Sequence, residues 1–363
     1  IDIHTVGAGG GSVALVNAGG FLQVGPKSAG ADPGPICYGL GGEELTLTDA
    51  NLMLGRLDPQ YFLGGKMRLE MEAVEVAMHD TGASLGMSQI ELAHSIVEIA
   101  NENMANAIRM VSIERGHDPR NFALLGFGGA GPLHAAAIAK KLGIPTVVIP
   151  PFPGSFSALG LLLGDLRVDK LWTQSYRSDR VTAEEVVSKF DAIAKAAVRE
   201  LRSQGFEGEP DLKYAINMRY LGQNYETEVE VPPLSQEMSG TSAVEQLERA
   251  YKAFDEKHKN MYDYVIKDSI IEMISFLVTA IGEIPHPALA KVSGDDSDTA
   301  RERLVHFAGL GSVSTKLIRR SAMPVNEVIV GPLLVEEAGS TTLVEPGMTA
   351  VRNEQDILIL EVG

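Results

Sequence analysis

The chain has 363 residues, and 31 Lys and Arg stand against 48 Asp and Glu, so its formal net charge is −17. This balance argues against binding a nucleic acid along a broad surface, because a basic patch is the usual footprint of such binding. A hydrophobic share of 45% rules out wholesale disorder, and one cysteine excludes an internal disulfide and a multi-thiolate zinc site. The length predicts two or three domains.

Compartment and solubility follow from the same counts. A single cysteine fits a reducing compartment, and no apolar stretch approaches the roughly 20 residues that span a bilayer. We therefore expect a soluble, cytoplasmic protein without a membrane partner.

Glycines crowd the beginning of the chain, where residues 1–65 hold 15 of the 38. The run Gly7–Ser12 precedes the apolar residues 13–16, and the next turn signal, at residues 19–20, precedes another short apolar run. This pattern predicts a loop and a β-hairpin. Four glycines in five positions exceed what a hairpin turn needs, and a backbone without Cβ atoms can wrap a phosphate. We therefore predict phosphate contact here, with Ser12 adding a hydroxyl donor.

An acid and two threonines follow this region, at Thr46, Thr48 and Asp49. Asp49 has two equally supported interpretations. It caps a short helix over residues 50–54, or it faces a phosphate or a metal-bound water. Cys37 has no His and acid near it in sequence, so we interpret it as structural.

The middle of the chain predicts helices and then a βαβ unit. Apolar residues recur at three- and four-residue steps within residues 70–115, which is typical of amphipathic helix. A strand over residues 122–127, a helix over 133–142 and a strand over 146–149 follow. A parallel strand pair joined by a helix indicates an α/β layer.

The turn inside this unit, Gly126-x-Gly128-x-x-Gly131, matches the dinucleotide fingerprint in the right context. That fingerprint also requires an acid at the end of the next strand, yet none occurs between Asp118 and Asp165. A nicotinamide-dependent oxidoreductase is therefore disfavoured, and a glycine turn that holds a mononucleotide is favoured. His134, just inside the helix, is interpreted as a core or capping residue rather than a base.

Composition changes after Trp172, so we expect two domains, residues 1–172 and 173–363. The second part predicts amphipathic helices over residues 183–204 and 243–262, and strands within 212–231 and 270–281. Residues 287–303 are polar and predict a surface loop. The tail, residues 327–362, predicts short strands that form a small β subdomain.

Several blocks of the sequence resemble the hydantoinase A family, which includes 5-oxoprolinase and the nucleotide-binding subunits of acetone and acetophenone carboxylases. The blocks span nearly the whole chain and are residues 3–12, 24–31, 33–38, 48–51, 112–120, 126–135, 219–226, 331–332, 336–337, 340–342 and 346–347.

The resemblance implies an α/β fold: an actin/sugar-kinase/Hsp70-like ATPase lobe followed by an α+β C-terminal domain. It implies ATP with Mg²⁺ or Mn²⁺, phosphorylation of a carbonyl oxygen of a lactam, hydantoin or ketone, and a hydantoinase B-type partner subunit that completes hydrolysis or carboxylation. The expected nucleotide-binding residues are Gly9, Gly10, Gly11, Ser12, Gly128, Gly129, Ala130 and Gly131. Asp49 is the expected catalytic acid, and no metal ligand is assigned.

Family members carry two Asp-x-Gly-Gly-Thr phosphate loops ahead of the region where this sequence begins, and neither loop is present here. We therefore expect another chain or segment to supply the missing N-terminal lobe and the principal base. The main hypothesis is one part of an ATP-dependent subunit for ring-opening hydrolysis of a cyclic amide such as 5-oxoproline or hydantoin. The alternatives are a ketone carboxylase subunit and a non-catalytic assembly half of a split ATPase.

Overall fold

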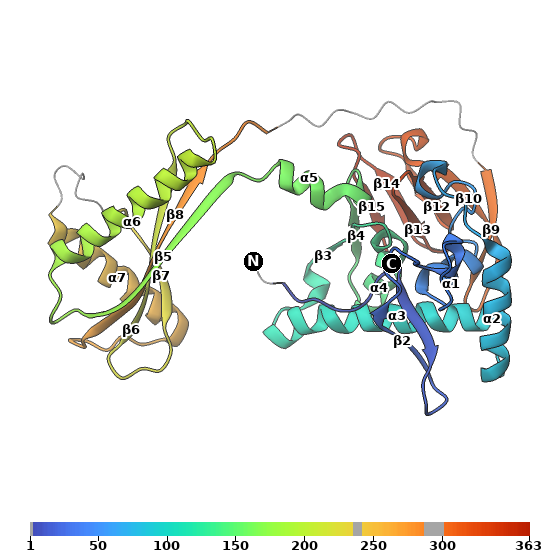
Figure 1. The fold of residues 1–363 in the computed structure, drawn as a ribbon, viewed down its shortest axis with the longest axis horizontal. Helices are drawn as coiled ribbons and strands as arrows, with labels where there is room; N and C mark the ends of the chain where they lie inside the picture. Colours follow the sequence, from blue (N-terminus) through green and yellow to red (C-terminus); the bar gives the residue numbers. More distant parts are fainter. Residues whose placement is uncertain (1–2, 235–241, 287–300) are drawn as a thin grey trace. The chain divides into compact units, whose positions relative to one another are not determined.

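The computed structural model describes residues 3–234, 242–286 and 301–363 (Figure 1). The chain divides into two compact units, the first made of Ile1–Gly160 with Leu289–Gly363 and the second of Leu161–Ala288. The tail therefore belongs to the same unit as the glycine-rich beginning. This division differs from the expected split at residue 172, because strands of the tail pair with strands of the first half. The predicted loop at residues 287–303 falls mainly outside the described residues.

The first unit begins with the predicted hairpin, in which β1 (Ser12–Val16) pairs antiparallel with β2 (Leu22–Ser28). Helical elements follow and pack around one apolar cluster. They are η1 (Ile36–Tyr38), α1 (Leu47–Met53), η2 (Phe62–Gly65), α2 (Met71–Leu85) and α3 (Gln89–Val111).

Local capping decides where these helices begin and end. The stretch expected to be helical over residues 70–115 is two helices, because Gly86 ends α2 in a left-handed conformation with φ 68°. Ser88 then starts α3 with a capping box, in which Glu91 bonds back to the Ser88 backbone. Helix α1 likewise begins at Leu47, three residues earlier than expected, because Thr46 is the N-cap.

The predicted βαβ unit is confirmed. β3 (Ala123–Leu125) pairs parallel with β4 (Thr146–Ile149), and α4 (Gly131–Leu142) connects them. Three strands of the tail extend this sheet rather than forming the separate β subdomain that was expected, since β15 pairs antiparallel with β4. The sheet order is β11-β14-β15-β4-β3, and the added strands are β11 (Val328–Val330), β14 (Thr349–Arg352) and β15 (Leu358–Glu361).

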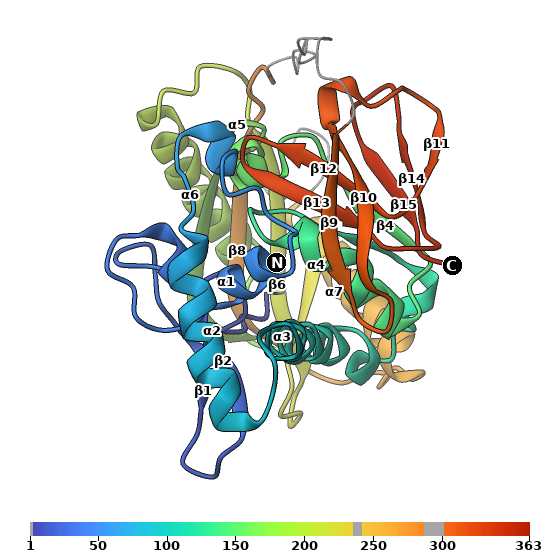
Figure 2. The same ribbon diagram turned by 90° about the vertical axis from the view of Figure 1, so that its right-hand side faces the viewer.

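A second sheet of the first unit comes wholly from the last part of the chain. Its order is β13-β12-β10-β9, and β10 and β12 run parallel. Its strands are β9 (Arg301–Phe307), β10 (Gly311–Arg319), β12 (Leu333–Glu337) and β13 (Ser340–Val344). Helix α4 packs on β13 and also on α3, which Figure 2 views end-on. One helix therefore joins the two sheets to the helical layer.

Short turns complete this unit. They are η3 (Ile113–Arg115), η4 (Pro119–Asn121), η5 (Pro153–Ser155), α5 (Phe156–Leu162), which runs into the second unit, and η6 (Arg320–Ala322).

The second unit is a two-layer α/β fold. Its antiparallel sheet has the order β5-β8-β6-β7, and α6 packs on β5 and β8 while α7 packs on β7 and on α6. The elements are β5 (Leu166–Arg177), α6 (Ala183–Ser203), β6 (Asp211–Tyr220), β7 (Thr227–Val231), α7 (Ala243–Tyr262) and β8 (Ile271–Gly282). The expected α/β class is confirmed. Across the described residues, no helix combines the length and apolar character needed to cross a bilayer.

Aromatic packing holds the core of the second unit. Phe190 on α6 is fully buried, and its ring centroid lies 5.6 Å from that of Tyr214 and 5.3 Å from that of Phe276. We expect Phe190→Ala to lower the free energy of unfolding by about 3–5 kcal/mol, because it removes buried contacts and leaves a cavity. Urea unfolding followed by circular dichroism measures this. Leu171→Ala, at a 64% exposed position on β5, is the control and changes stability by less than about 1 kcal/mol. Equal losses of stability in both variants contradict the placement of Phe190 in the core of the second unit.

Candidate functional site

The first glycine loop folds onto itself and onto the start of α1. The Ser12 hydroxyl accepts a hydrogen bond from the Gly9 backbone N–H at 2.9 Å and donates to the Gly7 carbonyl. Thr48 donates both its backbone N–H and its hydroxyl to the Gly10 carbonyl, at 2.9 and 2.8 Å. A Cβ atom on Gly10 would lie 2.8 Å from the Thr48 Oγ1, so only glycine fits this approach. The Ser12 hydroxyl, which was expected to contact phosphate, bridges two backbone groups of the loop in this structure.

The second glycine turn connects β3 to α4, and its glycines serve different purposes. A Cβ atom on Gly126 would lie 2.8 Å from Ile149 Cδ1 and 2.9 Å from Ala135 Cβ, so this glycine lets α4 approach the sheet. Gly128 adopts φ 85° and donates its N–H to the Pro153 carbonyl at 2.7 Å. Gly129 has room for a side chain, since a Cβ atom there would lie 3.6 Å from its nearest neighbour, the Gly339 carbonyl oxygen.

A third glycine turn meets the second one. The sequence predicted Gly339 only as a break between short strands of the tail, not this approach. Gly339 connects β12 to β13, and its carbonyl oxygen would lie 2.6 Å from a Cβ atom on Gly154. The flanking residues 336–337 and 340–342 belong to blocks of the family resemblance, which was a second signal for this region. Turns from residues 129, 154 and 339 thus come together without intervening side chains.

The turns at residues 129 and 339 and the first glycine loop border one cavity of about 460 Å³, a size typical of small-molecule pockets. Its lining residues come from both ends of the chain. They are Gly10, Gly11, Gly30, Ala31, Pro35, Tyr38, Thr48, Asn51, Leu57, Asp58, Tyr61, Phe62, Leu63, Met67, Gly129, Ala130, Leu133, Glu336, Glu337, Ala338, Gly339, Ser340 and Thr341. We call it the glycine cavity.

The structure thus brings four of the predicted nucleotide-binding residues to one place. Gly10 and Gly11 of the first loop and Gly129 and Ala130 of the second line the same cavity. The other four predicted residues are not among its lining residues. They are Gly9, Ser12, Gly128 and Gly131, which belong to the same two glycine segments.

Three carboxylates line the cavity, and arginines that are outside its lining bind them. The Arg303 guanidinium donates to Asp58 Oδ2 at 2.6 Å and to Glu336 Oε1 at 2.9 Å. Arg320 donates to Glu337 Oε1 at 2.8 Å. Burial raises the pKa of both glutamates, and the paired arginines oppose this shift.

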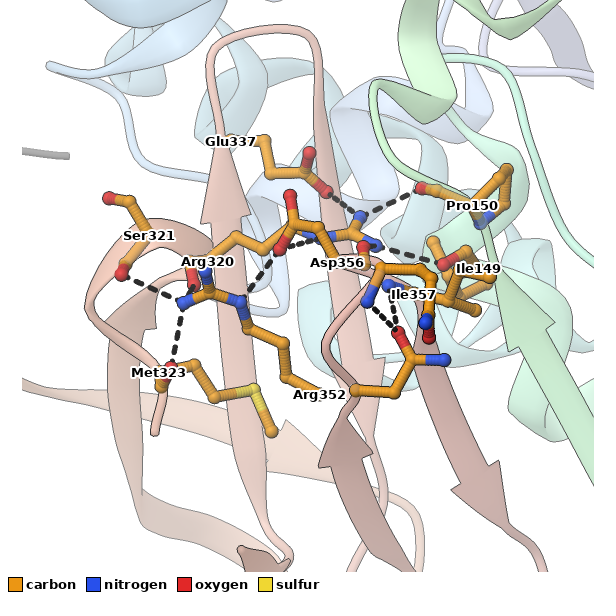
Figure 3. Close-up of polar contacts among 11 residues, drawn as sticks. Ile149, Pro150, Arg320, Ser321, Met323, Glu337, Arg352, Asp356 and Ile357 are labelled. Atoms are coloured by element: carbon orange, nitrogen blue, oxygen red, sulfur yellow. Dashed lines mark hydrogen bonds and ion pairs between the residues drawn. The ribbon is translucent and has the colours of Figure 1, made fainter. Parts of the chain in front are cut away.

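Arg320, on η6, also ties distant segments together (Figure 3). Its guanidinium is buried and donates to the backbone carbonyls of Ile149 and Pro150, both at 2.9 Å, and to the carbonyl of Asp356. Arg352 contacts the same segment. It donates to the carbonyls of residues 320, 321 and 323 and pairs with the Asp356 carboxylate. The end of β4, the end of β12 and the β14–β15 turn are therefore held at one point beside the cavity.

Asp49, the expected catalytic acid, is not among the residues that line the cavity. Its carboxylate is fully buried and accepts three hydrogen bonds, from the Cys37 N–H at 2.8 Å, the Thr46 N–H at 2.8 Å and the Thr46 hydroxyl at 2.7 Å. The capping interpretation agrees with this placement, although Thr46 is the N-cap and Asp49 is the third residue of α1. Burial, with the nearby Asp49 charge, raises the pKa of the Cys37 thiol strongly, which agrees with a structural cysteine.

His134 lies in a buried chain of polar side chains from three helices. Its Nε2 accepts from the Asn51 amide at 3.2 Å, so its Nδ1 carries the proton and donates to Asn101 Oδ1 at 2.8 Å. The Asn51 side-chain oxygen accepts from Arg56 at 3.3 Å. Burial, helped by the Arg56 charge, lowers the pKa of His134 to about 3. A neutral imidazole of fixed tautomer thus orients Asn51, which lines the cavity.

Two family models cover almost all of the chain. The model described as hydantoinase/oxoprolinase matches residues 1–170, and the one described as hydantoinase/oxoprolinase C-terminal domain matches residues 174–362. The chain belongs to the hydantoinase/oxoprolinase family. The boundary between the two models lies near residue 172, although the tail returns in space to the first unit.

Characterised relatives within the hydantoinase/oxoprolinase family act on different compounds. The caprolactamase subunit alpha of Pseudomonas jessenii is 36% identical over 96% of this chain, which covers 50% of that relative. The acetophenone carboxylase gamma subunit of Aromatoleum aromaticum is 31% identical over 98% of this chain and 50% of that relative. The chain thus spans about half the length of these relatives.

Solved structures share the fold. The crystal structure of the ATP-dependent caprolactamase from Pseudomonas jessenii matches all of this chain and 53% of its own with a TM-score of 0.74 at 35% identity. The nucleotide-free structure of acetone carboxylase matches 98% of this chain and 52% of its own with a TM-score of 0.83. Its 21% identity makes this a likeness of fold alone. Among the described residues, no cluster of three or more His, Cys, Asp and Glu side chains forms a metal site.

The placement of Asp49 predicts a structural effect without a binding effect. We expect Asp49→Asn to lower the free energy of unfolding by about 1–3 kcal/mol. The amide nitrogen of the new side chain cannot accept a hydrogen bond, so a buried donor, from Thr46 or Cys37, loses its acceptor. Denaturant unfolding measures the loss. Titration calorimetry with ATP·Mg²⁺ on the full-length protein tests binding, and the dissociation constant is expected to stay within about threefold. A large loss of affinity with unchanged stability restores Asp49 to the site.

The buried imidazole predicts a pH dependence of stability. An unfolded histidine binds a proton below about pH 6.5, whereas native His134 stays neutral down to about pH 3. The unfolded state therefore gains protons first, and stability falls as pH drops through this window. Between pH 7 and pH 5 this group costs about 2 kcal/mol. His134→Gln keeps a donor and an acceptor but does not titrate. The variant therefore loses about 2 kcal/mol less of its free energy of unfolding between pH 7 and pH 5 than the wild-type protein does. If the free energy of unfolding of the two proteins depends equally on pH, the buried neutral imidazole of His134 is not the cause.

Proposed function

We propose that this chain is part of an ATP-dependent enzyme subunit that phosphorylates the carbonyl oxygen of a cyclic amide. The observation that carries the proposal is the meeting of two glycine turns, far apart in sequence, at one cavity. The caprolactamase match supports a lactam-type substrate. The half of the relatives' length that this chain does not cover supports a further segment that completes the ATPase, as the missing phosphate loops suggested.

The residues present fit the phosphate end of a nucleotide. Gly10 and Gly11 place backbone on the cavity wall where no side chain intervenes, and Gly129 leaves open space where a side chain would project. Gly129 and Ala130 lie at the start of α4, whose N-terminus favours negative charge. Mg²⁺ or Mn²⁺ would enter with the phosphates, and the cavity carboxylates are ligands of the kind that hard cations bind. Asp49 is not assigned a part.

ATP, when bound, supplies a phosphoryl group that turns a stable amide carbonyl into an O-phosphorylated imidate, which water attacks far more readily. The carbonyl oxygen bonds to phosphorus as the bond from phosphorus to the leaving ADP oxygen breaks. The protein's contribution is positioning and neutralisation of charge rather than covalent chemistry. The glycine turns hold the phosphates, and a carboxylate of the cavity accepts the amide proton that the imidate must lose. A hydantoinase B-type partner subunit then completes ring opening.

A second candidate is the nucleotide-binding subunit of a ketone carboxylase, which the acetophenone carboxylase match favours. The same glycine turns would activate a ketone oxygen. Bicarbonate separates the two functions, because ketone-dependent ATP turnover that requires bicarbonate supports a carboxylase. Lactam-dependent turnover without bicarbonate supports hydrolysis. A non-catalytic assembly half is the third possibility, and ATP turnover by the isolated chain excludes it.

Gly129→Asp tests the nucleotide site most cleanly. This position has no positive φ and 3.6 Å of clearance, so the protein accommodates the side chain while the cavity receives a negative charge. We expect the full-length variant to bind ATP·Mg²⁺ at least tenfold more weakly by titration calorimetry, about 1.4 kcal/mol, with an unchanged melting temperature. Gly160→Asp introduces the same charge on α5, where nothing lies within 4 Å, and is the matched control. Equal affinity of the two variants refutes the assignment.

A further inference from the structure

One wall of the glycine cavity is apolar. Tyr38 of η1, Leu57, Phe62 and Leu63 of η2, and Met67 line it, and we call them the apolar wall. The ring centroids of Tyr38 and Phe62 lie 5.6 Å apart at 43°, and Leu57 is buried, so much of this wall is packed in place. It comes from residues 38–67, away in sequence from the glycine turns at residues 129–130 and 339. A ligand portion bound against it gains from burying methylene or ring surface.

The charged groups of the cavity all have one sign. Asp58, Glu336 and Glu337 line it, whereas no Lys, Arg or His among the described residues does so. Arg303 and Arg320 bind these carboxylates but are not lining residues, so their charge is already shared with an acid. Phosphates bring their own divalent cation, but a carboxylate on the second substrate would need a cation from the protein. The described residues that line the cavity supply no such cation.

The carboxylates suit a different partner, the N–H of a secondary amide. Asp58 is held in place, since its Oδ1 accepts from the Gln60 N–H at 2.8 Å and its Oδ2 from Arg303. Each carboxylate oxygen has more than one lone pair and accepts further hydrogen bonds. A ring with an apolar body, one N–H and one carbonyl therefore matches the wall, the acids and the glycine turns together.

We infer that the glycine cavity selects an uncharged cyclic amide and discriminates against the same ring carrying a carboxylate, such as 5-oxoproline. This inference rests on the proposed function and narrows its substrate class. The apolar wall holds the methylenes and the acids accept the ring N–H, while no cation among the described lining residues pairs with an added carboxylate. The two matched probes are pyrrolidin-2-one and 5-oxoproline, which share one ring and differ by the carboxylate alone.

The experiment uses the full-length protein assembled with its partner subunit and measures lactam-dependent ADP release for both probes. We expect kcat/KM for pyrrolidin-2-one to exceed that for 5-oxoproline at least tenfold. Leu63→Lys adds a cation at a cavity-lining position that is 46% exposed, so the charge stays solvated. We expect it to reduce this ratio at least fivefold. Leu63→Met, a flexible uncharged side chain, is the matched control and retains a ratio above ten.

The outcomes distinguish a failure of the selectivity inference from a failure of the proposed function. A ratio near or below one in the wild-type enzyme overturns the inference while the cyclic-amide function stands. A high ratio that Leu63→Lys and Leu63→Met lower equally overturns the assignment of the discrimination to charge at this wall. ADP release that responds to neither ring overturns the proposed function, and the inference with it. A high ratio lowered only by the lysine supports both.

Discussion

The buried guanidinium of Arg320 is the interaction on which the cavity depends. A charge in the interior is tolerated only when acceptors surround it, and here they come from three places in the chain: Glu337, the carbonyls at the end of β4, and the β14–β15 turn. Satisfying one side chain therefore fixes the relative position of segments some 200 residues apart in sequence. The Gly339 turn follows Glu337 directly, so its approach to the turns at residues 129 and 154 follows from the same contacts.

Close approach of backbone is the second constraint. Where the turns at residues 154 and 339 meet, a Cβ atom would come within 2.6 Å of a carbonyl oxygen, so these contacts exist because side chains are absent. The first loop meets α1 in the same way at Gly10. Glycine thus has two separate uses here: some glycines permit contacts within the protein, and Gly129 leaves open space in the cavity. Glycine-rich sequence alone does not distinguish these uses.

Two buried polar groups of the first unit are fully hydrogen-bonded within the fold. The Asp49 carboxylate accepts hydrogen bonds from the Thr46 N–H at the cap of α1 and from the Cys37 N–H. Both ring nitrogens of His134 are hydrogen-bonded to asparagine side chains. Each is fully enclosed, so each must be satisfied within the fold. Their effect on the site is indirect: they hold α1 and α4, from which Thr48, Asn51 and Ala130 reach the cavity wall. The acids that do line the cavity come from β12 and from the segment after α1.

Local patterns in the sequence determined the hairpin, the βαβ unit, the amphipathic helices and the family, because periodicity, caps and glycine motifs act over a few residues. They also located both glycine turns. Tertiary structure alone decided that the tail joins the first unit, that Gly339 lines the cavity, and that the Asp49 carboxylate is bound by Thr46 and Cys37. The physical reason is that strand pairing, such as β15 with β4, and the acceptors chosen by a buried arginine link residues whose separation leaves no local trace.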